Sequence, residues 1–128
     1  MNAASRVLTW VLLPFGERVV TVRRGPVAGS RMQLDLAHEK RYWLGHYEPA
    51  VEQVVTGLDL TGRTAWDVGA HIGYFTLLLA RKADGVVAVE ANPETAKRLR
   101  RPTGLTREQS RCRRQPSGAS SDSGSAAD

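Results

Sequence analysis

The sequence predicts an α/β fold in which one βαβ unit, residues 64–92, forms the centre of the chain. Two short apolar stretches, TAWDV and VVAV, have the composition of buried parallel strands. They are separated by a glycine turn, GAHIG, and a helical stretch, YFTLLLARKA. A chain of 128 residues has room for one domain with one modest core.

The positive charge is confined to the C-terminal part of the chain. The formal net charge is +5, yet residues 1–96 hold ten Lys and Arg residues against ten Asp and Glu residues. Residues 97–128 hold eight basic residues against three acidic ones, so the basicity does not describe the main body. Arg111, Arg113 and Arg114 have no aromatic platform beside them, so we expect no specific nucleic-acid partner.

The cysteine, histidine and apolar residues argue against a disulfide-bonded protein, a metalloprotein and a membrane-spanning protein. Cys112 stands alone, which fits a reducing, cytoplasmic setting. His38, His46 and His71 form no helical i, i+4 pair and no His/Cys cluster, so we expect no metal site. The apolar run Val7–Leu13 is far shorter than the roughly 20 residues of a spanning helix, so we expect no membrane span.

The first part of the chain is expected to supply a β layer. Residues 1–16 form an apolar N-terminal segment that we expect to be amphipathic and to pack against the rest of the chain. Residues 17–36 then alternate between apolar and polar positions on either side of a Gly/Pro-rich turn, which predicts a β-hairpin. We expect this hairpin to lean on the main sheet and to bury one face, which would carry Met32, Leu34 and Leu36.

A short amphipathic helix is expected next, from Pro49 to about Gly57. Proline suits a first helical turn, and apolar residues follow at helical spacing: Val51, Val54, Val55 and Leu58. The preceding stretch RYWLGHYE, residues 41–48, is expected to be a loop that leads to the cofactor cleft. Its aromatic side chains either pack against the first strand or form a lid over cofactor or substrate.

Acidic and glycine residues mark the carboxyl ends of the two strands of the βαβ unit. Asp67 ends the first strand, and Glu90 ends the second. Gly69 lets the chain turn sharply and is expected to bare backbone N–H groups, while Gly73 removes a Cβ where the next helix packs near a cofactor. Glu90 follows Gly69 by about 20 positions, the separation of an acid that holds ribose hydroxyls. Asn92 is expected to cap the following helix.

The spacing favours S-adenosyl-L-methionine over a dinucleotide. The fingerprint G-x-G-x-x-G, started at Gly69, requires a glycine at His71 and a small residue at Tyr74, and neither requirement is met. A pyrophosphate would therefore be crowded. The carboxylate of Asp67, two residues before Gly69, would repel a pyrophosphate and suits the α-amino group of a methionine moiety.

The stretches WDVGAHIGYFTLLLAR and VVAVEANPE, with LDLAHEKRYWLGHYEP upstream, resemble the FkbM-type methyltransferases over roughly residues 23–101. The resemblance implies an incomplete Rossmann-like class I methyltransferase fold with S-adenosylmethionine as cofactor. It also implies transfer of a methyl group to a hydroxyl oxygen, on a sugar, a glycan or a secondary metabolite. It identifies no catalytic base.

The same resemblance implies roles for individual residues around the cofactor. Asp67, Gly69 and Gly73 would line its methionine and ribose side, and Glu90 would take the ribose hydroxyls. Ala70 and His71 complete the glycine turn of the implied site, and His71 stands where the family often has asparagine. The remaining implied cofactor residues are Ala91 and Asn92, near the adenine, and Glu48.

The C-terminal part departs from the family pattern. Residues 102–128 contain one large aliphatic residue, Leu105, so we expect them to form a disordered tail behind a partial methyltransferase domain at 17–101. We interpret the chain as a truncated or frame-shifted reading of a longer methyltransferase that lacks the acceptor-binding half. TAWDV and VVAV are apolar enough to need cover on both faces, and an open sheet edge would invite self-association.

Three functions are compatible with these patterns. The first is an S-adenosylmethionine-dependent methyltransferase, whole or as an inactive fragment. The alternatives are a fragment of an NAD-type oxidoreductase and a non-catalytic product with a basic tail.

Overall fold

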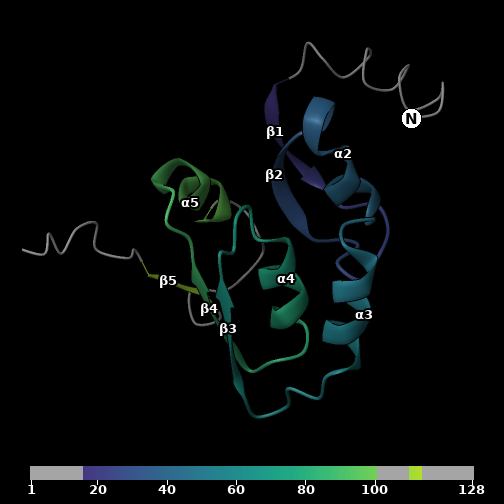
Figure 1. Cartoon of the computed structure of the whole chain (residues 1–128). Helices are drawn as coiled ribbons and strands as arrows, with labels where there is room; N and C mark the ends of the chain where they lie inside the picture. Colours follow the sequence, from purple (N-terminus) through teal and green to yellow (C-terminus); the bar gives the residue numbers. More distant parts are fainter. Residues whose placement is uncertain (1–15, 101–109, 114–128) are drawn as a thin grey trace, which may run out of the picture.

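The computed structural model describes residues 16–100 together with the backbone of residues 110–113 (Figure 1). Most of the apolar N-terminal segment expected from the sequence lies outside these described residues. The mixed α/β class is confirmed. In chain order the elements are β1 (Glu17–Thr21), β2 (Arg31–Asp35), α2 (Leu36–Leu44), α3 (Pro49–Gly57), β3 (Thr64–Val68), α4 (Tyr74–Ala80), β4 (Gly85–Val89), α5 (Pro93–Arg100) and β5 (Ser110–Arg113).

The expected βαβ unit is present as β3, α4 and β4. The two strands pair in parallel, with Trp66 opposite Val87 and Asp67 opposite Ala88. β4 is the better covered strand, and its three central residues are buried. Helix α4 packs against both strands and lies between them and α3 (Figure 1).

Strand β5 contradicts part of the expectation for residues 102–128. The backbone of Ser110–Arg113 pairs in parallel with β4, on the side away from β3. Main-chain groups alone make a sheet ladder, so the free N–H and C=O groups of β4 can recruit a segment that lacks an apolar side-chain pattern. The rest of the expected disordered tail lies outside the described residues. The two edge strands of the described sheet are β3 and β5.

The N-terminal hairpin is confirmed as the antiparallel pair β1 and β2, with Val20 opposite Met32. Strand β2 ends one residue earlier than the alternation predicted. The carboxylate of Asp35 accepts a hydrogen bond from the Ala37 amide at 3.0 Å, which caps a helix that starts at Leu36. The Asp35 amide in turn donates to the Glu39 carboxylate at 2.8 Å.

The expectation of a loop over residues 41–48 is therefore wrong for its first half. Arg41, Tyr42 and Trp43 belong to α2, which ends at Gly45 in the left-handed conformation, at φ 67°. A Cβ on Gly45 would lie 2.0 Å from the Arg24 carbonyl oxygen, so only glycine fits there. Residues 46–48 form the connection to α3.

The main hydrophobic core lies between the hairpin, α2 and α4, and not between the hairpin and the sheet. Its buried residues are Val22, Val27, Met32, Leu34, Leu36, Tyr42, Ile72, Tyr74, Leu77 and Leu78. The guanidinium of Arg81, just after α4, donates to the carbonyl oxygens of Pro26 and Ala28 at 2.8 and 2.5 Å. The hairpin thus packs on α4 and is fixed there by its own turn.

Two apolar surfaces expected to be covered are exposed. Trp66 and Val68 of β3 are 61% and 77% exposed, because side chains alternate along a strand and Asp67 takes the face toward α4. No residue of α3 is buried, and Val54 is 65% exposed. Self-association through an open sheet edge stays a prediction.

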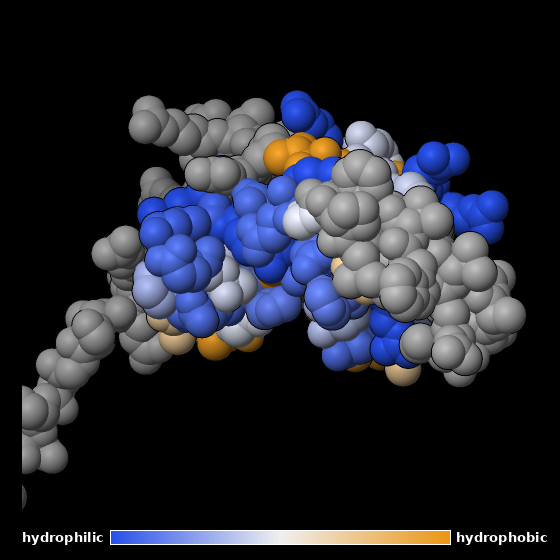
Figure 2. All heavy atoms as spheres, turned by 90° about the horizontal axis from the view of Figure 1, so that it is seen from above, coloured by the Kyte–Doolittle hydropathy of each residue, from blue (hydrophilic) through white to orange (hydrophobic). Residues whose placement is uncertain are grey.

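One face of the molecule is seen when it is viewed from the end at which β1 and β2 lie. The described residues are mainly hydrophilic on that face, with separate hydrophobic areas (Figure 2). Within residues 16–100 and 110–113, no helix has the length and apolar composition needed to cross a membrane.

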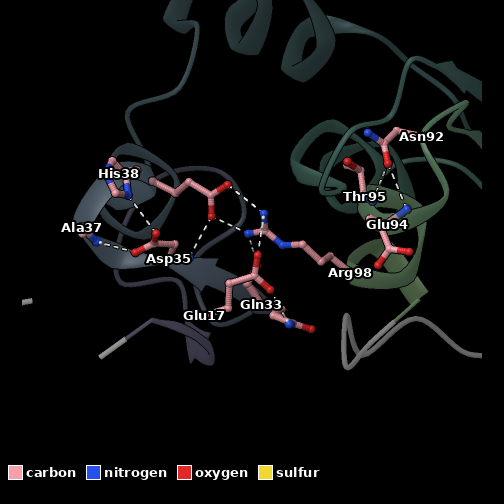
Figure 3. A network of polar contacts seen from close by, with 10 residues as sticks. Glu17, Gln33, Asp35, Ala37, His38, Asn92, Glu94, Thr95 and Arg98 are labelled. Carbon is pink, nitrogen blue, oxygen red and sulfur yellow. Dashed lines mark hydrogen bonds and ion pairs between the residues drawn. The ribbon is translucent and has the colours of Figure 1, made fainter. Parts of the chain in front are cut away.

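Arg98 of α5 joins the βαβ unit to the N-terminal elements (Figure 3). Its guanidinium donates to Glu39 of α2 through both terminal nitrogens and to the Gln33 carbonyl oxygen of β2 at 2.8 Å. A longer ion pair, at 3.4 Å, reaches Glu17 of β1. The side chains of Arg98 and Glu39 are only 16% and 17% exposed, so water screens their attraction poorly.

We expect Arg98→Met to lower the free energy of unfolding by about 3 kcal/mol, because it leaves a largely buried Glu39 carboxylate without its partner. Urea denaturation followed by circular dichroism measures the loss. The matched control is Lys97→Met, which removes an exposed pair with Glu94 and should cost less than about 1 kcal/mol. Equal losses for the two variants would contradict the assignment of Arg98 as the connecting residue.

Candidate functional site

A cavity of about 180 Å³ opens at the carboxyl end of β3. Its walls come from three places: the end of β3 with the turn that follows it, the first turn of α4, and the end of α2 with its connection to α3. The lining residues are Tyr42, Tyr47, Glu48, Asp67, Gly69, Ala70, His71, Ile72, Tyr74 and Phe75.

Asp67 is the acidic group on the sheet side of the cavity. The buried hydroxyl of Thr76 in α4 donates to its Oδ2 at 2.5 Å, which fixes the orientation of the carboxylate. Burial raises the pKa of Asp67, and the negative charge of Glu90 raises it further, while the bond from Thr76 opposes both effects. The free site therefore favours a positive partner for this carboxylate.

The glycine turn after β3 keeps its backbone N–H groups within the protein. The amides of Gly69 and Ala70 donate to the Val89 carbonyl oxygen at 2.9 and 3.0 Å, and the His71 amide donates to the Glu90 carboxylate at 2.8 Å. The expectation that Gly69 bares N–H groups for a ligand is wrong for these amides. They connect β3 to the end of β4 instead.

The two glycines of the turn have different tasks. Gly69 has φ +79°, and nothing lies within 4 Å of the position that its Cβ would take. Gly73 has φ +92°, and its Cβ would lie 2.3 Å from Cδ1 of Leu99 in α5. The space that Gly73 provides is thus filled by α5, and Gly73 does not line the cavity.

Glu90 organises the turn from the neighbouring strand. One carboxylate oxygen accepts from the His71 amide, and the other accepts from the Asn92 amide at 2.8 Å. Each oxygen keeps a further lone pair for a ligand hydroxyl. Glu90 does not line the cavity itself, but it holds a residue that does.

Asn92 caps α5, as the sequence predicted. Its Oδ1 accepts from the amides of Glu94 and Thr95 at 2.9 and 3.3 Å (Figure 3). Asn92 and Ala91 are exposed beyond the end of β4 and do not line the cavity. Of the residues expected at the cofactor, those in the cavity wall are Glu48, Asp67, Gly69, Ala70 and His71.

Part of the cavity wall is an aromatic cluster, none of whose members was expected at the cofactor from the sequence. The Tyr42 and Tyr47 ring centroids lie 4.2 Å apart, and Tyr74 lies 5.6 Å from each. Phe75 lies 5.9 Å from Tyr47. The interleaved aromatic residues of RYWLGHYE were the available signal. Tyr42 is buried in the core and also lines the cavity, and the half-buried Tyr47 lines it too. A lid over cofactor or substrate stays a prediction.

The hydroxyl groups of the buried tyrosines stay protonated. Tyr74 donates to the Glu52 carboxylate at 2.6 Å. Burial raises the pKa of Tyr74, and the acceptor Glu52 adds to the shift. Burial likewise raises the pKa of Tyr42, followed by the effect of the neighbouring Tyr47 hydroxyl. Neither group can act as a phenolate base near neutral pH.

Backbone strain is concentrated at the cavity. Among the described residues, the non-glycine residues with positive φ are Glu48, at 49°, and His71, at 50°. Both line the cavity. Such conformations cost of order 1 kcal/mol each and gather at binding and active sites. Histidine and asparagine are among the side chains that tolerate a positive φ best. Either residue is therefore compatible with the backbone conformation at position 71.

The cavity wall contains acids and aromatic rings but neither Lys nor Arg. The acids are Glu48 and Asp67. Within residues 16–100 and 110–113, no three His, Cys, Asp or Glu residues gather as a metal ion would require. The chemistry of the wall suits an organic cation.

No protein-family model and no curated protein matches the sequence. A solved structure does: the crystal structure of Trm5b from Pyrococcus abyssi, with 26% sequence identity and a TM-score of 0.53. The match covers 75% of this chain and 27% of that chain. Trm5b is an S-adenosylmethionine-dependent tRNA methyltransferase, and the likeness supports a methyltransferase-like fold for this chain.

Proposed function

We propose that the cavity at the carboxyl end of β3 binds the methionine part of S-adenosylmethionine and that the chain is part of a methyltransferase. The observation that carries this proposal is the cavity wall, which has two carboxylates and an aromatic cluster but neither Lys nor Arg. A cationic amino-acid group gains from such a wall, whereas the two negative charges of a pyrophosphate are repelled by it. The likeness to Trm5b supports the same cofactor.

The arrangement of polar groups at the strand ends argues against the NAD-type alternative. A dinucleotide is normally held by free amides of a glycine turn at a helix N-terminus. Here the amides of Gly69, Ala70 and His71 already have protein acceptors. A pyrophosphate would have to displace those bonds beside the Asp67 carboxylate.

Each residue then has a defined task toward the cofactor. Asp67 and Glu48 hold the α-ammonium group, and Glu90 accepts hydrogen bonds from the ribose hydroxyls through its remaining lone pairs. Ala91 and Asn92, at the end of β4, lie toward the adenine. Gly69, Ala70 and His71 shape the turn that separates the methionine part from the ribose.

When bound, S-adenosylmethionine supplies an electrophilic methyl group, and the chain contributes position and charge. The carboxylates fix the ammonium group, which orients the sulfonium for in-line attack. We propose an FkbM-type enzyme that acts on a hydroxyl group, on a sugar or secondary metabolite, and we assign no catalytic base. The described residues correspond to part of Trm5b, so acceptor binding is not assigned to them.

The first test is isothermal titration of the protein with S-adenosylmethionine, S-adenosylhomocysteine and NAD. We expect binding of the two adenosyl compounds and none of NAD, because the former bring an α-ammonium group to Asp67, whereas NAD would bring its negatively charged pyrophosphate beside that carboxylate. A preference for NAD would overturn the proposed cofactor. Absence of all binding would favour the non-catalytic alternative.

We expect Glu90→Ala to weaken S-adenosylhomocysteine binding by about tenfold, the factor typical of a lost hydrogen bond to a charged group. The variant loses both the ribose contact and the brace on the His71 amide. Glu94→Ala is the matched control, since Glu94 is an exposed acid paired with Lys97 and should leave the dissociation constant unchanged. Equal affinities for Glu90→Ala and the parent protein would remove the ribose assignment.

The pKa of Asp67 predicts a pH dependence. Its raised pKa means that the folded protein binds a proton more tightly than the unfolded chain, so this group's contribution to stability is lost as pH rises through the folded pKa. A cationic ligand prefers the carboxylate, so affinity should rise with pH through the same range and then level off. Titration calorimetry between about pH 4 and 7.5 measures the profile.

Asp67→Asn should bind S-adenosylhomocysteine weakly and with a flat profile across this range. The control is Asp59→Asn, because Asp59 is an exposed acid in the turn before β3 whose pKa is lowered by hydrogen bonds from the amide and hydroxyl of Thr61. An unchanged pH profile in Asp67→Asn would assign the titration to another group.

A further inference from the structure

Tyr47 is the central ring of the aromatic cluster at the cavity. Its centroid lies 4.2 Å from that of Tyr42, 5.6 Å from Tyr74 and 5.9 Å from Phe75. Tyr42 and Tyr74 belong to the buried core, whereas Tyr47 is half-buried and lies in the short connection between α2 and α3. The Tyr47 ring can therefore contact a ligand without leaving a buried position in the core.

The backbone around Tyr47 is held in place. Its amide donates to the Glu52 carboxylate at 3.4 Å, and the same carboxylate oxygen accepts the Tyr74 hydroxyl. The next residue, Glu48, has the strained left-handed conformation and occupies the N-cap position directly before α3. Strain of this kind persists only where surrounding contacts enforce it, so the connection has a defined shape against the cavity.

The proposed cofactor carries two positive centres that need different partners. The α-ammonium group donates hydrogen bonds and suits Asp67 and Glu48. The sulfonium has no N–H or O–H to donate, so its charge is best stabilised by the negative face of an aromatic ring. The cavity offers both kinds of partner, with no Lys or Arg in its wall to oppose them.

Resting on the proposed function, we infer that Tyr47 is a specificity-determining residue that recognises the sulfonium charge of S-adenosylmethionine through its ring face. The product S-adenosylhomocysteine has a neutral thioether at the same position. A cation–π contact therefore favours the substrate over the product, so that the product leaves once the methyl group has been transferred. The hydrogen bonds of the carboxylates to the α-ammonium group do not make this distinction, because both compounds keep that group.

The test is the ratio of the dissociation constants of S-adenosylhomocysteine and S-adenosylmethionine, measured by calorimetry for the full chain and three variants. In Tyr47→Leu we expect this ratio to fall about fivefold, the factor for a partly exposed cation–π contact, while S-adenosylhomocysteine affinity stays within about twofold. Tyr47→Phe keeps the ring and should keep the ratio. Trp43→Leu removes an aromatic residue of α2 outside the cavity wall and should also keep it.

The outcomes separate this inference from the proposed function. If Tyr47→Leu weakens both compounds equally, Tyr47 has only a structural role and the inference is overturned, although the cofactor assignment stands. A fall in the ratio that Tyr47→Phe reproduces would assign the effect to the hydroxyl group and also overturn it. If the parent protein binds neither compound, the proposed function fails first.

Discussion

Helix α4 has to bury two faces, and the arrangement of the described residues follows from that constraint. One face meets the parallel sheet, where Thr76 donates to Asp67. The other face supplies Tyr74, Leu77 and Leu78 to the core that α4 shares with the hairpin and α2. The first turn of α4 follows the turn after β3 and lies beside the end of α2, where Tyr74 contacts Tyr42. The cavity forms at this junction, where an acid from the sheet faces tyrosines from the helices.

The ligand charge that the site prefers depends on which backbone N–H groups already have hydrogen-bond acceptors within the protein. Glu90 uses one oxygen for the His71 amide and one for the Asn92 amide, so it shapes the turn before any ligand arrives. With the turn amides bonded inside the protein, the site offers an anion few donors, and it presents carboxylates to a cation. Preorganised polar groups of this kind cost little reorganisation when a ligand binds.

The exposed apolar residues have a common physical origin. Strand side chains alternate, so the orientation of Asp67 toward α4 directs Trp66 and Val68 to the opposite face of the sheet. Helix α3 contacts α4 over a small area, and its half-buried Val55 is the valine that packs at the margin of the core. The apolar periodicity of a sequence indicates which residues can be buried on one face. It does not indicate how much of that face the other described elements cover.

The sequence by itself determined the local elements: the hairpin, the βαβ unit, the Asn92 cap and the acids at the strand ends, because each depends on neighbours within a few positions. Helix α2 was also locally encoded, in the Asp35 cap and Glu39, but the strand alternation through Leu36 obscured that signal. Only the tertiary structure decided that the hairpin packs on α4, that Leu99 fills the space at Gly73, and that Tyr47 and Asp67 line the same cavity. Those contacts join residues far apart in the chain, and their geometry depends on packing that no local pattern contains.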